Sequence, residues 1–215
     1  MAQVLAIAEG ITTFRQVEQK LGLSLSNDPD FFEEWRETLP DLTVAQQSRL
    51  DEVRQNYLYQ ISDGVLLEET IKLVILSPLM ELAGFYSPPY KFRAEVPVEV
   101  KALGDNSEVL RGRIDGLVLL EKLWVVVVES KKTTFDLEVA LPQTLAYMAA
   151  SPQREQPLYG MVANGSSYLF VKAQGDRYDV SDVFGTRSQS RNNLYEVLKI
   201  LKHLGHLLSA SVPPL

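Results

Sequence analysis

A run of four valines constrains the fold of this chain more than any other segment. Residues 123–131 read Leu-Trp-Val-Val-Val-Val-Glu-Ser-Lys, and an unbroken, β-branched apolar run is typical of a strand that is buried on both faces. Such a strand lies inside a sheet that carries helices on both sides. It ends, however, in Glu129 and Lys131. Charged groups at the end of a buried strand are costly unless they are paired or reach a solvated pocket.

The segments around this strand predict an α/β (α+β) fold in which a mixed β-sheet is flanked by helices. Two strands with period-two alternation precede it, and a helix, a hairpin with a turn at Asn164–Gly165, a short strand and a final helix follow it. The expected elements are strands at 92–100, 108–120 and 123–131, a helix at 135–150, strands on either side of the turn within 158–173 and at 176–180, and a helix at 192–209.

The first part of the chain is predicted to be helical. Capping and periodicity indicate helices from Thr12 or Thr13 to Gly22, over 28–40 with Asp28 as the cap, and over 43–62. A further amphipathic helix runs through 63–85 and ends at Gly84. We therefore divide the chain into an N-terminal helical extension, 1–62, and a sheet-containing domain, 63–210.

Composition excludes several kinds of site. The chain has 215 residues, enough for one large domain, and no cysteine, so that disulfides, thiolate metal sites and cysteine nucleophiles are excluded. Two histidines are too few for a histidine-built zinc site. A net charge of −7 argues against a strong, autonomous DNA binder. No signal peptide or membrane span is recognisable, so we expect a cytoplasmic protein.

Asp115 and Glu129 lie near the same end of two consecutive strands. A two-residue turn at Glu121–Lys122 would pair Asp115 with Val128 and place Glu129 on the opposite face of the sheet. A turn longer by one residue, or a bulge at Gly116, would bring the two carboxylates to the same face. The sequence leaves both registers open.

Two carboxylates on one face repel each other unless a cation lies between them. A hard cation such as Mg²⁺ (or Mn²⁺), held by carboxylates, waters and a substrate phosphate, meets this need. Lys131 would face the same point and could orient a water or stabilise charge that develops on a phosphate. Gln143 and Tyr147 are four residues apart on the next helix and therefore share one helical face.

This order of residues resembles the PD-(D/E)XK nuclease superfamily. Asp115, Glu129-Ser130-Lys131 and Gln143-x-x-x-Tyr147 resemble the branch with a Q-x-x-x-Y motif, represented by the N-terminal nuclease domain of type I restriction enzyme R subunits. The resemblance covers residues 65–172. It implies a restriction-endonuclease-like fold and a metal-dependent endonuclease, a hydrolase that acts on DNA. Ile114 replaces the proline that precedes the aspartate in the family, and no helicase motor or P-loop is present, so we expect a stand-alone nuclease-like domain.

The resemblance also implies roles for individual residues. A glutamate on the helix before the sheet binds metal in this family, and here it is Glu68 or Glu69, of which Glu68 is in phase with the apolar face. The implied metal ligands are Glu68, Asp115, Glu129 and the carbonyl of Ser130; the implied catalytic residues are Asp115, Glu129 and Lys131; the implied contacts to nucleic acid or to the surroundings of the metal are Gln143, Tyr147, Lys132 and Arg113. Many nucleases of this fold act as dimers, so the resemblance is compatible with a homodimer.

Two other interpretations belong to different classes. One is a binding or regulatory protein that keeps the nuclease fold without turnover, as the acidic net charge favours. The other is a structural interaction domain in which Glu129 and Lys131 form a plain ion pair. The aromatic cluster over residues 85–92 is capable of stacking on bases, but such clusters more often cover a sheet edge or a helix end, and we expect that role here.

Overall fold

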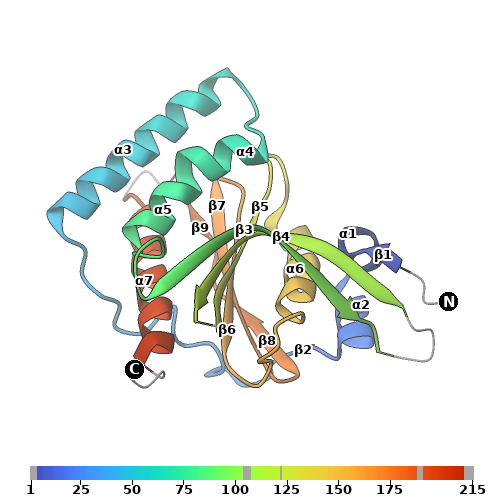
Figure 1. Cartoon of the computed structure of the whole chain (residues 1–215). Helices are drawn as coiled ribbons and strands as arrows, with labels where there is room; N and C mark the ends of the chain where they lie inside the picture. The colour runs from blue at the N-terminus through green and yellow to red at the C-terminus, as the bar shows by residue number, and fades with distance from the viewer. Residues whose placement is uncertain (1–3, 104–107, 122, 188–190, 211–215) are drawn as a thin grey trace.

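The computed structural model describes residues 4–103, 108–121, 123–187 and 191–210. Its centre is a nine-stranded mixed sheet flanked by helices, which confirms the predicted α/β class (Figure 1). The main strand order is β1-β4-β5-β6-β7-β8-β2, with β3 paired to β4 and β9 paired to β7. The strands are β1 (Val4–Ala6), β2 (Ser24–Leu25), β3 (Tyr90–Lys101), β4 (Val109–Leu120), β5 (Leu123–Ser130), β6 (Leu158–Ala163), β7 (Ser167–Gln174), β8 (Arg177–Val180) and β9 (Phe184–Gly185).

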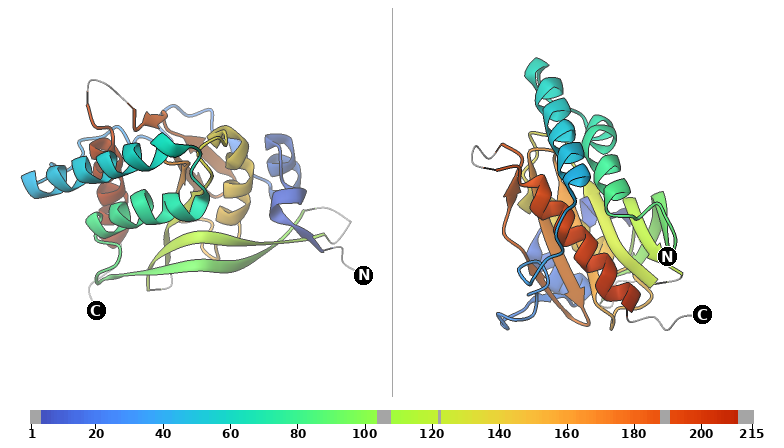
Figure 2. Two further views of the ribbon diagram at one scale, coloured as in Figure 1. Left: turned by 90° about the horizontal axis from the view of Figure 1, so that it is seen from above. Right: turned by 90° about the vertical axis from the view of Figure 1, so that its left-hand side faces the viewer.

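The helices form a layer on each face of the sheet (Figures 1 and 2). One apolar core joins the sheet to α3, α4, α5 and α7, and the other joins it to α1, η1 and α6. Val126 and Val128 are buried in the first core and Val127 is buried in the second, so this part of the valine run is covered on both faces, as its composition predicts. The helical segments are α1 (Ile7–Gly10), α2 (Phe14–Gln16), η1 (Val17–Leu21), α3 (Val44–Gln60), η2 (Ile61–Asp63), α4 (Glu68–Ile71), η3 (Lys72–Leu76), α5 (Ser77–Leu82), α6 (Leu137–Met148) and α7 (Leu194–Ala210).

The helix ends follow their local signals. Thr13 and Thr43 each accept a hydrogen bond from a backbone N–H of the first turn in a reciprocal capping box, which satisfies donors that otherwise have no partner. Gly22 and Gly84 end their helices with φ of 68° and 86°, values that glycine adopts without steric cost. The predicted helices at 12–22 and 43–62 are thus confirmed. The helix predicted over 63–85 is shorter: it begins at Glu68, after a non-helical stretch at 64–67, and has a π-helical turn, η3, in its middle.

The helix predicted over 28–40 is absent; the segment forms turns. Phe31 and Phe32 are adjacent and both buried, and Lys172 Nζ donates to the carbonyl of Phe31 at 2.7 Å. These tertiary contacts override the capping signal at Asp28. Two strands were not predicted, β1 and β2, which pair in parallel with β4 and β8 and so add Val4–Ala6 and Ser24–Leu25 to the sheet. The division at residue 62 remains a prediction.

The strand register settles the question about the two carboxylates. Leu120 pairs with Leu123, as a two-residue turn predicts, although Lys122 itself lies outside the described residues. A bulge between Val118 and Leu119 then shifts the register by one residue. Gly116 therefore pairs with Val128, and the next position of each strand brings Asp115 level with Glu129.

No helix within the described ranges is both long and apolar enough to cross a membrane.

Candidate active site

Next to Asp115, one edge of β4 has no strand partner among the described residues. On this edge β4 pairs with β5 from Leu120 to Gly116 and with β1 from Arg111 to Val109. Between them, no described strand pairs with residues 112–115 on this side, while β3 pairs along the other edge. The carboxylate of Asp115 occupies this opening, where Oδ2 accepts a hydrogen bond from the Ser130 backbone N–H at 2.7 Å. The end of β5 is thus tied to β4 through a side chain.

Glu129 is the most constrained charged group of the site. Its residue is 2% exposed, and Oε1 lies 2.5 Å from the Lys131 ammonium nitrogen. Oε2 is buried and has no hydrogen-bond partner among the described residues. Burial raises the pKa of the Glu129 carboxyl to about 7; the charge of Lys131 opposes this rise, whereas the charges of Asp115 and Glu68 add to it. One oxygen of Glu129 is therefore left for a positively charged or hydrogen-bonding group.

Lys72 is a site residue that the sequence analysis missed. Its ammonium group lies 2.7 Å from Asp115 Oδ1 and 3.3 Å from Glu95 Oε1. It belongs to the π-helical turn η3, a distortion that often marks functional positions. The sequence spacing could have indicated Lys72, because it lies four residues after Glu68 and therefore shares its helical face.

Two glutamates near Lys72 differ in orientation. Glu69 is exposed, whereas Glu68 is partly buried and its charge acts on Glu129. The preference for Glu68 as the helix carboxylate of the site is therefore consistent with the geometry. On β3, Glu95 has a φ of 52°, which is rare for a residue with a side chain. This strained position lies across β4 from the opening, between the residues that pair with Gly116 and Ile114.

Gln143 and Tyr147 meet on α6 as their spacing predicts. Gln143 Nε2 donates to the Tyr147 hydroxyl oxygen at 2.6 Å. The ring of Tyr147 lies against Gly112, where an added Cβ would be 2.7 Å from Cε1 of the ring. Burial, together with the negative charges of Glu129 and Asp115, raises the pKa of Tyr147 to about 12. Tyr147 thus lies against β4 at Gly112, and its hydroxyl stays protonated at neutral pH.

Of the remaining predicted residues, two are exposed at the surface and one is buried beside Asp115. Lys132 and Arg113 are exposed, which leaves both side chains accessible to a large anionic partner. Ser130 is fully buried and contributes its backbone N–H to Asp115. The backbone carbonyl of Ser130, a predicted metal ligand, lies at the end of β5.

The donor chemistry fits a divalent cation. Within the described part of the chain, no group of three or more His, Cys, Asp or Glu side chains converges closely enough to hold a metal ion. Mg²⁺, however, is commonly held by one or two carboxylates with waters and substrate phosphates. The unpartnered Oε2 of Glu129, level with Asp115, is a donor of this kind.

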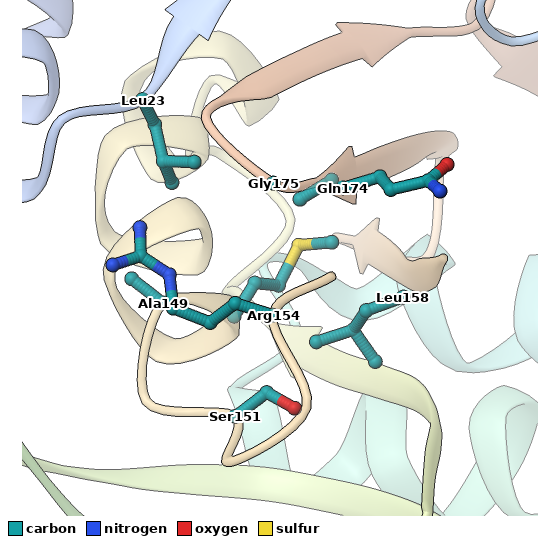
Figure 3. Close-up of a pocket in the computed structure, with 9 residues that line it drawn as sticks. Leu23, Ala149, Ser151, Arg154, Leu158, Gln174 and Gly175 are labelled. Atoms are coloured by element: carbon teal, nitrogen blue, oxygen red, sulfur yellow. The ribbon is translucent and has the colours of Figure 1, made fainter. Parts of the chain in front are cut away.

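Two cavities differ in their relation to this site. The pocket in Figure 3 is lined by Leu23, Arg154 and neighbouring residues, has a volume of about 10 Å³ and contains none of the residues described above. Its arginine is already bound, since Arg154 donates to the Leu21 carbonyl at 3.0 Å. A second cavity, of about 170 Å³, lies beside Asp115 and includes Lys72 in its wall. The second cavity is therefore the one connected with the candidate active site.

No model of a known protein family matches the chain, and no curated protein shows significant similarity to it.

Proposed function

We propose that this chain is a metal-dependent nuclease that hydrolyses phosphodiester bonds of DNA in the cytoplasm. The proposal includes a restriction-endonuclease-like fold, supported by the order of helix α4–α5, strands β3–β5, helix α6 and hairpin β6–β7. One observation carries it: the buried carboxylate of Glu129, with an oxygen that has no partner, lies level with Asp115 at an opening in the sheet. Lys131 compensates the charge at Oε1, and the buried Oε2 leaves a position at which a second cation would be stabilised.

In this mechanism Asp115, Glu129 and the carbonyl of Ser130 would hold Mg²⁺ or Mn²⁺, and Glu68 on α4 would contribute a further carboxylate. The bound cation would lower the pKa of a water and offset charge on the scissile phosphate. Lys131 is held at 2.5 Å by Glu129, which restricts its ammonium group to the region of the carboxylates. It would stabilise negative charge that develops on the phosphate.

Other side chains would hold the nucleic acid. Gln143 and Tyr147 restrain each other's polar groups, and the hydroxyl of Tyr147 remains protonated well above neutral pH. It can therefore donate to a phosphate oxygen beside the carboxylates. Lys132 and Arg113 are exposed and would contact phosphates further along the strand. A homodimer, which sedimentation would detect, would allow both strands to be cut.

A second candidate is a nuclease-fold protein that binds or regulates without turnover. One observation favours it: Lys72 already neutralises Asp115 from 2.7 Å. If Lys72 is a permanent substitute for the metal, the site keeps its charge balance without a cation. This candidate predicts no binding of Mg²⁺ and no cleavage.

Calorimetric titration of Mg²⁺ and Mn²⁺ separates the two. In the nuclease, the wild type and the exposed control Asp41→Ala release the same binding heat, and Asp115→Ala abolishes it. The titration is repeated with a short duplex, because a substrate phosphate can complete the coordination of the metal. Plasmid DNA is then incubated with each protein and Mg²⁺, and nicking that Asp115→Ala and Glu129→Gln both lack supports catalysis at this site. Absence of metal binding under both conditions would favour the second candidate.

A further inference from the structure

The wall of the cavity beside Asp115 is charged at one end and mostly apolar elsewhere. It lies under the α4–α5 helix and against β3, β4 and β5, with a volume of about 170 Å³. Of the described residues that line it, Lys72 and Asp115 carry the charges, and most of the others are apolar or aromatic. One end of the cavity is therefore the charged edge of the candidate active site, and the rest is suited to an apolar group.

Two aromatic rings form the part of the wall that solvent can reach. The rings of Tyr86 and Phe92 meet edge to face, with centroids 5.3 Å apart and an interplanar angle of 81°. Tyr86 is 46% exposed and Leu73 is 74% exposed, so part of the cavity wall lies at the surface. Large apolar groups that remain exposed around a concave site commonly mark a binding site.

The position of Phe92 depends on Gly116. A Cβ at Gly116 would be 2.7 Å from Cζ of the Phe92 ring. The ring therefore lies directly over the β4 backbone, next to Asp115. Its neighbours in the aromatic cluster have a different role: Phe85 is fully buried and packs edge to face on Tyr90 at 5.3 Å. The expected role of covering a sheet edge or a helix end applies to Phe85, whereas Tyr86 and Phe92 also line the cavity.

We propose that this cavity binds one unpaired nucleobase of the nucleic-acid substrate, next to the phosphate that the carboxylate site would receive. The proposal rests on the proposed nuclease function and specifies its substrate: a strand with an unpaired base at the cleavage site. A cavity of about 150 Å³ holds a single benzene ring, so this one has room for one heteroaromatic ring but not for a base pair. The aromatic wall stacks on the base, and the charged end faces the sugar-phosphate backbone.

Binding is measured in a Glu129→Gln background, which removes turnover but leaves the cavity wall unchanged. The probes are a fluorescein-labelled 12-nucleotide single strand and the blunt duplex of the same sequence, followed by anisotropy. The variants are Tyr86→Leu and Phe92→Leu, which keep apolar volume and remove a ring. The matched control is Phe14→Leu, since Phe14 is 43% exposed and does not line the cavity. Tyr86 is a surface residue, so its variant remains informative if Phe92→Leu alone lowers the melting temperature.

We expect the single strand to bind about tenfold tighter than the duplex, because base–aromatic stacking contributes roughly 1–3 kcal/mol per base. Each ring variant weakens single-strand binding by about fivefold to a hundredfold, and Phe14→Leu leaves it unchanged. Equal affinity of the ring variants and their background for the single strand, or equal affinity for single strand and duplex, would overturn the base site.

Cleavage by the otherwise unmodified protein separates this inference from the nuclease proposal. If the protein cuts nucleic acid with Mg²⁺ but the ring variants bind the single strand as tightly as their background, the base site is wrong and the nuclease proposal stands. If the ring variants bind the single strand more weakly but the protein cuts nothing, the base site stands and the nuclease proposal is wrong.

Discussion

The ammonium group of Lys72 lies between Asp115 on β4, at 2.7 Å, and Glu95 on β3, at 3.3 Å. Partial burial lowers the pKa of Lys72, but the hydrogen bonds and charges of the two carboxylates outweigh burial and raise it overall. Lys72 is therefore charged at neutral pH and neutralises the carboxylate that a metal would use. A divalent cation at Asp115 must compete with it.

Lys72→Met is expected to tighten the binding of Mg²⁺. A hydrogen bond to a charged group contributes about 1.5–3 kcal/mol, so removing the competitor should lower the dissociation constant by about tenfold or more. Calorimetric titration measures the dissociation constant of Mg²⁺. Lys91→Met, an exposed lysine of β3, is the control and should match the wild type. An unchanged dissociation constant in Lys72→Met would show that Lys72 and the cation do not share Asp115.

Glu129 should make stability fall as pH rises towards neutrality. Burial raises its pKa from 4.5 to about 7, so between these values the folded state holds a proton that the unfolded state has released. The folded state loses this advantage as pH rises, and the contribution is complete below pH 4.5 and absent above pH 7. The expected loss is roughly 3 kcal/mol, relative to a variant without this group.

Urea unfolding of the wild type and of Glu129→Gln, at several pH values from 4.5 to 8, measures this contribution as a difference between two proteins. The difference in free energy of unfolding should shift in favour of Glu129→Gln as pH rises. Glu138→Gln, at an exposed position, is the control for loss of a surface carboxylate. Parallel pH profiles for the wild type and Glu129→Gln would mean that Glu129 titrates near its ordinary pKa when folded.

Metal binding should depend on pH through the same group. Because the carboxyl of Glu129 has a pKa of about 7 and must lose its proton to bind a cation, Mg²⁺ affinity should rise between pH 6 and pH 8 and protons should be released. Titration in buffers of different ionisation enthalpy counts these protons. Binding that releases none at pH 6 would show that Glu129 is not a ligand.

Periodicity and capping were sufficient to predict β3 to β8 and the helices α3 and α7. The bulge between Val118 and Leu119 was beyond the sequence, because a one-residue shift leaves an apolar strand apolar on both faces. The alternation that normally fixes register was absent there. The valine run therefore predicts a buried strand but does not indicate which residue of β5 lies opposite Asp115.

The parts that the sequence did not predict depend on distant contacts. Lys72 comes close to Asp115 only because α4–α5 packs on the sheet across β4. The turns at 28–40 depend in the same way on Lys172, far along the chain, which binds the Phe31 carbonyl. Local propensity has no information about either partner, and tertiary contacts outweigh it.

Gly112→Ala tests whether Tyr147 packs closely against β4. The new Cβ would lie 2.7 Å from Cε1 of Tyr147 and 3.2 Å from Cδ1 of Ile7, so the ring must shift from its position. Overpacking of this kind costs about 1–3 kcal/mol. Urea unfolding should show this loss, and the second variant Gly112→Ala/Tyr147→Leu should recover part of it. A loss that Tyr147→Leu does not relieve would place the clash elsewhere.

Glu34 and Lys172 anchor the segment that the sequence expected to be helical. Lys172 Nζ lies 2.5 Å from Glu34 Oε1, which also accepts a hydrogen bond from the Tyr159 hydroxyl at 3.0 Å. The two charged side chains are 13% and 11% exposed. Removing one partner of such a pair leaves a buried charge without compensation, at a cost of about 3–5 kcal/mol. Glu34→Ala should therefore lower the melting temperature by about 10 °C.

The same variant should free the turns at 28–40. Arg36 is exposed, and trypsin should cut after it faster in Glu34→Ala than in the wild type, because cleavage requires the segment to leave the sheet. Glu33→Gln, at a neighbouring exposed glutamate, should be cut at the wild-type rate. Adding Lys172→Met to Glu34→Ala removes the uncompensated charge and should restore part of the melting temperature, since two residues in one ion pair are not additive. Additive losses in the double variant would show that the pair does not anchor this segment.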